Sequence, residues 1–91
     1  MKITPNNLIY HELIGLDVVV EANTAKSMIG IAGKVVDETR NMLVIEKRGV
    51  EKMVPKSQSV FCFRMEDGSE VRVEGKLLLA RPEDRTGKLR R

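Results

Sequence analysis

Short segments in which apolar and polar residues alternate, separated by turn residues, run through most of this 91-residue chain. A period of two places one set of side chains on the buried face of a strand and the other set in solvent. Strands this short, with a turn every eight to twelve positions, are typical of small barrels and sandwiches. Closing the sheet also removes the free edges that promote aggregation. The sequence therefore predicts an all-β fold, a small antiparallel barrel of about six strands.

The clearest element is a hairpin over residues 60–73 (VFCFRMEDGSEVRV). A two-residue turn sets both phenylalanines opposite charged residues, which leaves the two rings without apolar partners. A three-residue loop, with its glycine in the left-handed conformation, instead sets Phe63 opposite Val71 and Phe61 opposite Val73. We therefore expect a bulged hairpin in which both rings face the core.

The other strands are less regular. One begins at residue 16, and a second, over residues 28–36, contains two glycines that predict a bend or bulge. Two more are expected at residues 42–47 and 52–56, the latter short and near an edge because it contains a proline. An apolar run over residues 76–81 is expected to close the sheet against an earlier strand.

A short helix is expected in front of the barrel. Thr4 is a good N-cap, Pro5 suits the first helical position, and apolar residues follow before Gly15. A chain of this length has no room for a second domain. We therefore treat residues 1–91 as a single domain that consists of a helical segment (1–15), a barrel (16–81) and a basic C-terminal tail (82–91).

Composition and the N-terminal sequence indicate where such a protein works. Apolar residues make up 42% of the chain and charged residues 32%, which favours a folded domain over a disordered one. No run approaches the about 18 apolar residues of a membrane span, and the start of the chain lacks the apolar core of a secretion signal. We therefore expect a cytoplasmic protein without membrane contact.

No constellation of catalytic or metal-binding residues stands out. His11 is the single histidine and Cys62 the single cysteine, so the chain holds neither an internal disulfide nor a Cys/His zinc cluster, and no triad is visible. The segment GIAGK at residues 30–34 lacks the spacing and the Ser or Thr of a phosphate-binding loop. The acidic pairs at residues 37–38 and 83–84 are expected to be solvated. The sequence therefore predicts no catalytic site, no metal site and no bound cofactor.

Positive charge is concentrated at the C-terminal end. The net charge is +3, whereas residues 1–80 contain as many acidic as basic side chains, so the excess lies in residues 81–91. Such a tail is typical either of a solvated terminus or of a phosphate-binding protein. Tryptophan is absent and both phenylalanines are needed for the core, so base stacking is disfavoured. RNA binding would then depend on shape and phosphate contacts.

Three segments resemble the archaeal ribonuclease P protein component 1 family. They lie at residues 7–18 (NLIYHELIGLDV), 29–46 (IGIAGKVVDETRNMLVIE) and 56–85, and together they cover most of the chain. The order of LIGL, GKVVDETRNML and RPEDR is the specific part of the resemblance. It implies a six-stranded, Sm-like antiparallel barrel preceded by a short helix, which agrees with the strand count above.

The resemblance also implies a function. The chain is expected to be a noncatalytic RNA-binding subunit of the ribonuclease P ribonucleoprotein, whose RNA removes the 5′ leader from precursor tRNA. It implies ribonuclease P RNA and a zinc-binding protein subunit as partners, precursor tRNA as an indirect one, and magnesium as a requirement of the RNA. The alternative is another small RNA-associated barrel, of a ribosomal or Sm-type assembly. A nuclease active on its own is a third reading, which we do not expect.

Roles can be assigned to individual residues on this basis. For RNA contact we favour eight basic residues, although some basic residues of the chain alternatively serve only to keep it soluble. The eight are Lys34, Arg40, Lys56, Arg81, Arg85, Lys88, Arg90 and Arg91. Arg81 and Arg85, in the RPEDR motif, could instead pair with the neighbouring acids Glu83 and Asp84 and fix the chain end. For the partner surface we favour the N-terminal segment, because a helix this short must dock to be stable. Its expected contact residues, which alternatively cap the mouth of the barrel, are Leu8, Ile9, His11, Leu13 and Ile14.

Overall fold

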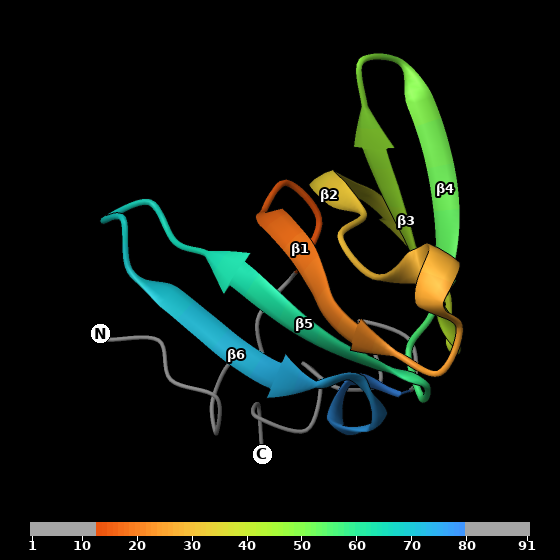
Figure 1. Cartoon of the computed structure of the whole chain (residues 1–91). Helices are drawn as coiled ribbons and strands as arrows, with labels where there is room; N and C mark the ends of the chain where they lie inside the picture. The colour runs from red at the N-terminus through yellow and green to blue at the C-terminus, as the bar shows by residue number, and fades with distance from the viewer. Residues whose placement is uncertain (1–12, 80–91) are drawn as a thin grey trace.

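The computed structural model describes residues 13–79, which form a six-stranded antiparallel sheet in the order β4-β3-β2-β1-β5-β6 (Figure 1). Two short 3₁₀ helices, η1 and η2, accompany the strands. In chain order the elements are β1 (Asp17–Asn23), η1 (Lys26–Met28), β2 (Ala32–Glu38), β3 (Met42–Lys47), β4 (Val50–Pro55), β5 (Ser59–Arg64), β6 (Glu70–Glu74) and η2 (Gly75–Leu78). Within residues 13–79 no helix has the length and apolarity needed to span a membrane.

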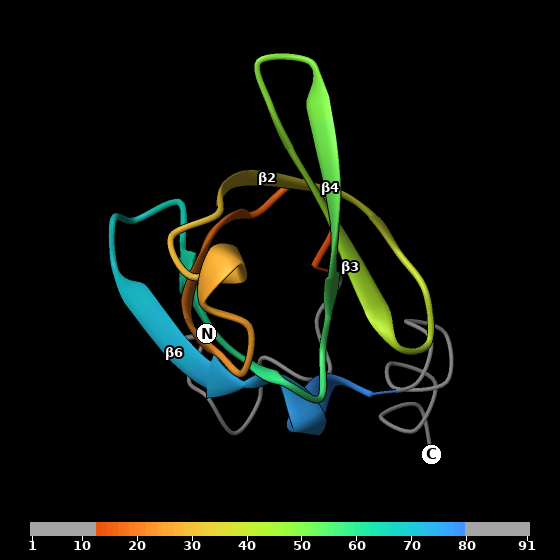
Figure 2. The same ribbon diagram turned by 45° about the vertical axis from the view of Figure 1, so that its right-hand side comes forward.

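The sheet curls strongly but does not close (Figure 2). β4 and β6 are its two edges, and no ladder of hydrogen bonds joins them, so the expectation of a closed barrel is not met among the described residues. The edges nevertheless approach each other at one corner. Gly75, directly after β6, lies so close to the backbone carbonyl of Lys56, directly after β4, that a Cβ atom on Gly75 would overlap the carbonyl oxygen.

The apolar interior follows the alternation that the sequence shows. In β1, β5 and β6 every second residue is buried, and these side chains pack with those of β2, β3 and β4 into one core. The hairpin register is confirmed, with Phe61 opposite Val73 and Phe63 opposite Val71. Gly68 has a φ of 89°, the left-handed conformation expected of the loop. The two rings lie 6.0 Å apart between centroids and are both fully buried.

Other strand boundaries differ from the prediction. The strand at residues 42–47 is confirmed, but β2 begins at Ala32 rather than at residue 28, because the chain first passes through η1 and through Gly30, whose φ is 91°. β4 begins two residues earlier than expected. The run that was expected to close the sheet is wrong as a strand, since Gly75–Leu78 is a 3₁₀ helix. Of its leucines, Leu78 is buried in the core cluster, whereas Leu77 and Leu79 are exposed.

The predicted N-terminal helix and C-terminal tail lie mostly outside the described residues. Of the segment 1–15 the structure describes its last three residues, which form a turn: the amide of Leu16 donates to the carbonyl of Leu13 at 3.1 Å. Gly15 has a φ of 95° and its amide donates to the carbonyl of Val35 at 2.8 Å. This turn ties the start of the described chain to β2.

Candidate nucleic-acid interface

Lys56 does not lie on the surface, and its prediction as an RNA contact is wrong for this fold. Its side chain is fully buried and its Nζ donates to Glu38 Oε2 at 2.6 Å, in an ion pair in which neither side chain is exposed. The same Nζ also donates to the carbonyls of Thr39 at 2.7 Å and Arg40 at 3.3 Å. Glu38, expected to be solvated, is buried for the same reason. An ammonium group with these partners is not available to a phosphate.

Two other predicted RNA contacts lie within the described residues, and both are exposed. Lys34 lies on β2, and its Nζ is 3.9 Å from Asp17 Oδ1 with both side chains more than half exposed. Arg40 is exposed in the turn between β2 and β3. The remaining five, Arg81, Arg85, Lys88, Arg90 and Arg91, lie outside the described residues.

Several other exposed cations in the described part of the chain are paired with carboxylates. Arg72 Nε lies 2.8 Å from Glu21 Oε1, and Arg64 Nη2 lies 3.4 Å from Glu70 Oε2. Lys76 Nζ lies 3.5 Å from Glu74 Oε1. These exposed pairs contribute little stability, but each places a negative charge beside the positive one. A phosphate approaching them meets nearly neutral surface.

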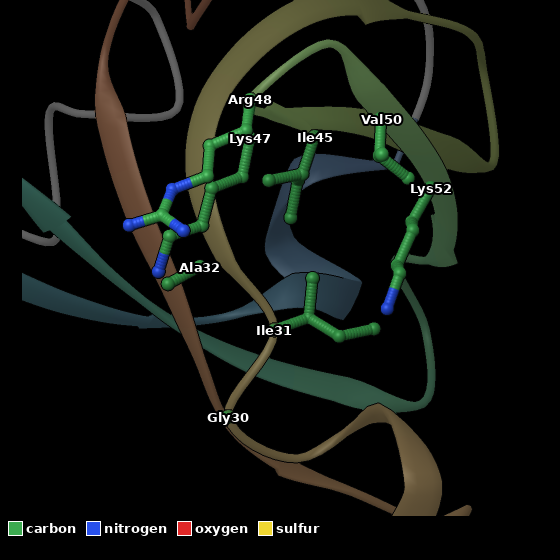
Figure 3. A pocket seen from close by; sticks show the side chains of 8 residues that line it. All are labelled: Gly30, Ile31, Ala32, Ile45, Lys47, Arg48, Val50 and Lys52. Atoms are coloured by element: carbon green, nitrogen blue, oxygen red, sulfur yellow. The ribbon is translucent and has the colours of Figure 1, made fainter.

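The tip of the β3–β4 hairpin is different, because three cations gather there without such partners. Lys47, Arg48 and Lys52 line a hollow of about 480 Å³ together with five other residues: Gly30, Ile31, Ala32, Ile45 and Val50. All three cations are exposed, and no ion pair joins any of them to a carboxylate within residues 13–79. Figure 3 shows Lys47 and Arg48 on one side of the hollow, near Ala32, and Lys52 on the other.

The register of the hairpin explains this gathering. Lys47 is opposite Val50 and Ile45 is opposite Lys52, so these four side chains share the face of the hairpin that continues into the core. The two acidic residues of the hairpin, Glu46 and Glu51, are opposite each other and therefore lie on the other face. Charge is thus segregated across the hairpin, with the cations on its inner face. Figure 1 shows the hairpin reaching away from the rest of the sheet, which exposes that face.

The turn that carries Arg48 is strained. Lys47 and Val50 are the last paired residues, so Arg48 and Gly49 form a two-residue loop in which both have positive φ, 54° and 81°. This is the signature of a type I′ turn, where Asn-Gly is the preferred sequence. Arg48 is the one residue other than glycine with a positive φ in the described part of the chain. A left-handed conformation costs such a residue about 1–2 kcal/mol.

This cluster was not among the predicted sites, although the sequence carries a signal for it. Lys47-Arg48-Gly49 stands between two strands of alternating pattern, where a two-residue turn places neighbouring cations at an exposed tip. What the sequence did not show is that Ile31, from the loop before β2, lies against the same face.

The predicted partner surface is divided by the structure. Leu13 is fully buried in the core cluster, so its assignment to a partner surface is wrong and the alternative of capping the core holds for this residue. Ile14, the next residue, is 43% exposed and stays available to a partner. Leu8, Ile9 and His11 lie outside the described residues.

Cys62 has the character of a small structural residue. It is half-buried on the face opposite Phe61 and Phe63, and burial, followed by the charges of Glu21 and Glu70, raises the pKa of its thiol. A raised pKa leaves less thiolate at neutral pH, and the thiolate is the reactive form. We expect iodoacetamide to alkylate Cys62 in the folded chain more slowly than free cysteine at pH 8, with the difference lost in denaturant. An equal rate in both states would contradict this environment.

No group of three or more His, Cys, Asp or Glu side chains with the arrangement of a metal site occurs within residues 13–79.

The chain matches a known protein family and several named proteins over most of its length. Residues 6–88 match the family described as Ribonuclease P/MRP, subunit p29. A Methanocaldococcus jannaschii protein named Ribonuclease P protein component 1 is 55% identical over 87 residues, which cover 94% of this chain and 90% of that protein. A Methanothermobacter thermautotrophicus protein of the same name is 49% identical over 87 residues, which cover 94% of this chain and 94% of that protein.

A solved structure described as "Structure of Mth11: A homologue of human RNase P protein Rpp29" has the same fold. It superposes with a TM-score of 0.62 at 50% sequence identity, over 82% of this chain and 97% of that one. Sequence and fold thus agree over most of the length of both proteins, and the chain belongs to the Ribonuclease P/MRP p29 family.

Proposed function

We propose that this chain is a noncatalytic, RNA-binding protein subunit of the ribonuclease P ribonucleoprotein, in which the RNA removes the 5′ leader of precursor tRNA. The observation that carries the proposal is the family match over residues 6–88, together with relatives named Ribonuclease P protein component 1 that align over nearly their whole length. The alternative of a ribosomal or Sm-type protein is not favoured by these matches.

A binding role without catalysis is supported by how the described residues are used. The interior of the sheet is filled with apolar side chains. Within residues 13–79 the one ion pair with both side chains fully buried, Lys56 with Glu38, joins the end of β2 to the chain that follows β4. The cations of the β3–β4 hairpin remain exposed and unpaired within the described residues. Exposed cations without neighbouring acids are suited to contact phosphates. When they neutralise RNA phosphates, condensed counterions are released from the RNA, which favours binding.

The partners and setting belong to the same proposal. Ribonuclease P RNA is the nucleic-acid partner, and a zinc-binding protein subunit docks on the N-terminal surface that includes Ile14. Magnesium serves the RNA, this chain holds no cofactor, and the assembly works in the cytoplasm. We also infer that the curled sheet is a variant of the Sm-like barrel. Its strand order and the approach of its two edges at Lys56 and Gly75 support this description.

The test is the salt dependence of binding between the full chain and transcribed ribonuclease P RNA. With four to six phosphate contacts, the logarithm of affinity is expected to fall against the logarithm of salt concentration with a slope of roughly −3 to −5. Filter binding over a series of salt concentrations measures this slope. A flat profile, or magnesium-dependent RNA cleavage by the purified chain alone, contradicts the proposal.

Recovery of RNA from a cell extract separates the two RNA-binding alternatives. The tagged chain is expected to retain ribonuclease P RNA. Retention of ribosomal RNA without ribonuclease P RNA would support a ribosomal role instead.

A further inference from the structure

We infer that the hollow beneath the β3–β4 hairpin binds an unpaired nucleotide of the RNA, with its phosphates on Lys47, Arg48 and Lys52 and its nucleoside against Ile31 and Val50. The inference rests on the proposed function, and it adds a site to it that lies outside the basic residues chosen from the sequence. Three features of the hairpin carry it: its charge, its strained turn and its apolar floor.

The acidic and basic side chains of the hairpin lie on opposite faces. Solubility does not require this separation, whereas binding of an anion does. A surface that needs only to be soluble gains nothing from separating acids from bases, because mixed signs serve equally well. Here Glu46 and Glu51 face each other on one side, although like charges directly opposite are destabilising. Lys47 and Lys52 lie on the other side, and within residues 13–79 neither forms an ion pair with a carboxylate. The field over the inner face is therefore positive, and its natural ligand is an anion.

The conformation of Arg48 provides a second, independent observation. Asparagine or glycine would occupy this left-handed position with less strain, whereas arginine at a φ of 54° is held there against its preference. Strain of this kind persists at binding sites because the side chain is needed there. Figure 3 shows the Arg48 side chain beside Lys47 and reaching toward Ala32, so the two cations lie together on one side of the hollow.

The apolar floor selects the kind of anion. Val50 is 58% exposed and Ile31 is partly buried, so both present aliphatic surface between the cations (Figure 3). A free phosphate or an RNA duplex meets the cations but leaves this surface in water. A nucleotide turned out of a helix carries an anionic phosphate and an apolar base face in one unit, and the hollow of about 480 Å³ has room for it. An acidic protein segment is the other occupant of suitable charge.

The experiment compares two triple variants of the full chain that carry the same change in net charge. Hairpin variant K47Q/R48N/K52Q removes the cations of the hollow. Control variant R64Q/R72Q/K76Q removes three cations that are paired with carboxylates elsewhere on the sheet. Affinity for transcribed ribonuclease P RNA is measured at about 0.1 M salt, where each lost phosphate contact is expected to weaken binding about five- to eightfold.

The hairpin variant is expected to bind about 125- to 500-fold more weakly, and its salt slope to become shallower by about 2 to 3. The control variant is expected to stay within about threefold of the parent chain, because charges outside the contact are screened at this salt concentration. Equal weakening by the two variants would mean that net charge alone matters, and would overturn the site. So would a hairpin variant that binds RNA as the parent does.

R48N separates binding from folding. Because asparagine suits the left-handed position better, this variant is expected to melt at a temperature equal to or above that of the parent chain. Its RNA affinity is nevertheless expected to fall about five- to eightfold. A loss of affinity with no loss of stability supports the site, and unchanged affinity counts against Arg48 as a contact.

Crosslinking identifies the occupant. RNA containing 4-thiouridine is expected to crosslink to the peptides that hold Ile31 and Val50 through nucleotides that are unpaired in the RNA. Crosslinks through paired nucleotides would overturn the nucleotide pocket. Normal RNA binding by the hairpin variant with loss of the protein partner would show that an acidic protein segment occupies the hollow. If the parent chain itself fails to bind ribonuclease P RNA, it is the proposed function that fails.

Discussion

Replacing Lys56 by methionine is expected to lower the free energy of unfolding by about 3–5 kcal/mol, because it leaves the carboxylate of Glu38 buried without its partner. Methionine fills much the same volume, so lost packing is a small part of the effect. The carbonyls of Thr39 and Arg40 also lose the ammonium donor that lies 2.7 and 3.3 Å away. Urea denaturation followed by circular dichroism measures the change.

Two further variants make the cause of this loss visible. The double variant K56M/E38L removes both charges and is expected to recover a large part of the stability, since an apolar pair often replaces a buried ion pair at little cost. K26M, at an exposed lysine of η1, is the matched control and is expected to stay within about 0.5 kcal/mol of the parent. A K56M chain as stable as K26M would mean that Lys56 is in solvent.

The same variants decide what Lys56 contributes to RNA binding. Because its ammonium lies inside the fold, K56M/E38L is expected to bind RNA as the parent chain does, provided that it is folded under the conditions of the assay. If the double variant is folded but binds RNA more weakly than the parent chain, Lys56 contacts RNA after all.

The hairpin of β5 and β6 shows why part of the fold was accessible from sequence. Burial of two phenylalanines on one face excludes the shorter turn, since a shift of one residue exposes both rings. Local sequence therefore determines the register, which the pairing of Phe61 with Val73 confirms. The same reasoning located β3, whose apolar core stands between clear turn signals.

Lys56 and Glu38 show what local sequence cannot supply. They are 18 positions apart, and lysine and glutamate are rarely buried unless they are paired. The pairing exists because β2, β3 and β4 are neighbouring antiparallel strands. Their register sets Glu38 opposite Leu43 and Leu43 opposite Val54, so the end of β2 and the end of β4 lie at the same end of the sheet. The hollow at the β3–β4 hairpin was missed for the same reason, because Ile31 reaches it from another part of the chain.

The prediction of a closing strand at residues 76–81 was wrong for a steric reason that composition does not reveal. An apolar run after a glycine matches a short strand, but here Gly75 brings the chain against the backbone at Lys56 and the next three residues turn into η2. The edges of the sheet therefore meet at a single corner instead of along a ladder. That corner depends on the absence of a side chain at residue 75.

Replacing Gly75 by alanine is accordingly expected to destabilise the fold by about 3 kcal/mol or more, at the upper end of the range for overpacking. The added Cβ would overlap the carbonyl oxygen of Lys56 and would lie 2.8 Å from Cε2 of Phe61. Neither neighbour can easily move: the carbonyl accepts a hydrogen bond from the amide of Ser59 at 3.1 Å, and the ring is fully buried. The sheet would have to open at its corner to admit the methyl group.

G68A is the matched control, because it adds the same methyl group where no atom lies within 4 Å. Its expected loss of about 1–2 kcal/mol comes from the left-handed conformation alone, with a φ of 89°. Gly75 has no such positive φ, so its larger loss would isolate the steric contact between the two edges. Denaturation of both variants in urea gives the comparison, and hydrogen exchange at the amide of Ser59 reports whether the corner has opened. If G75A is no less stable than G68A and that amide stays protected, the two edges are not in the close contact that ends the sheet here.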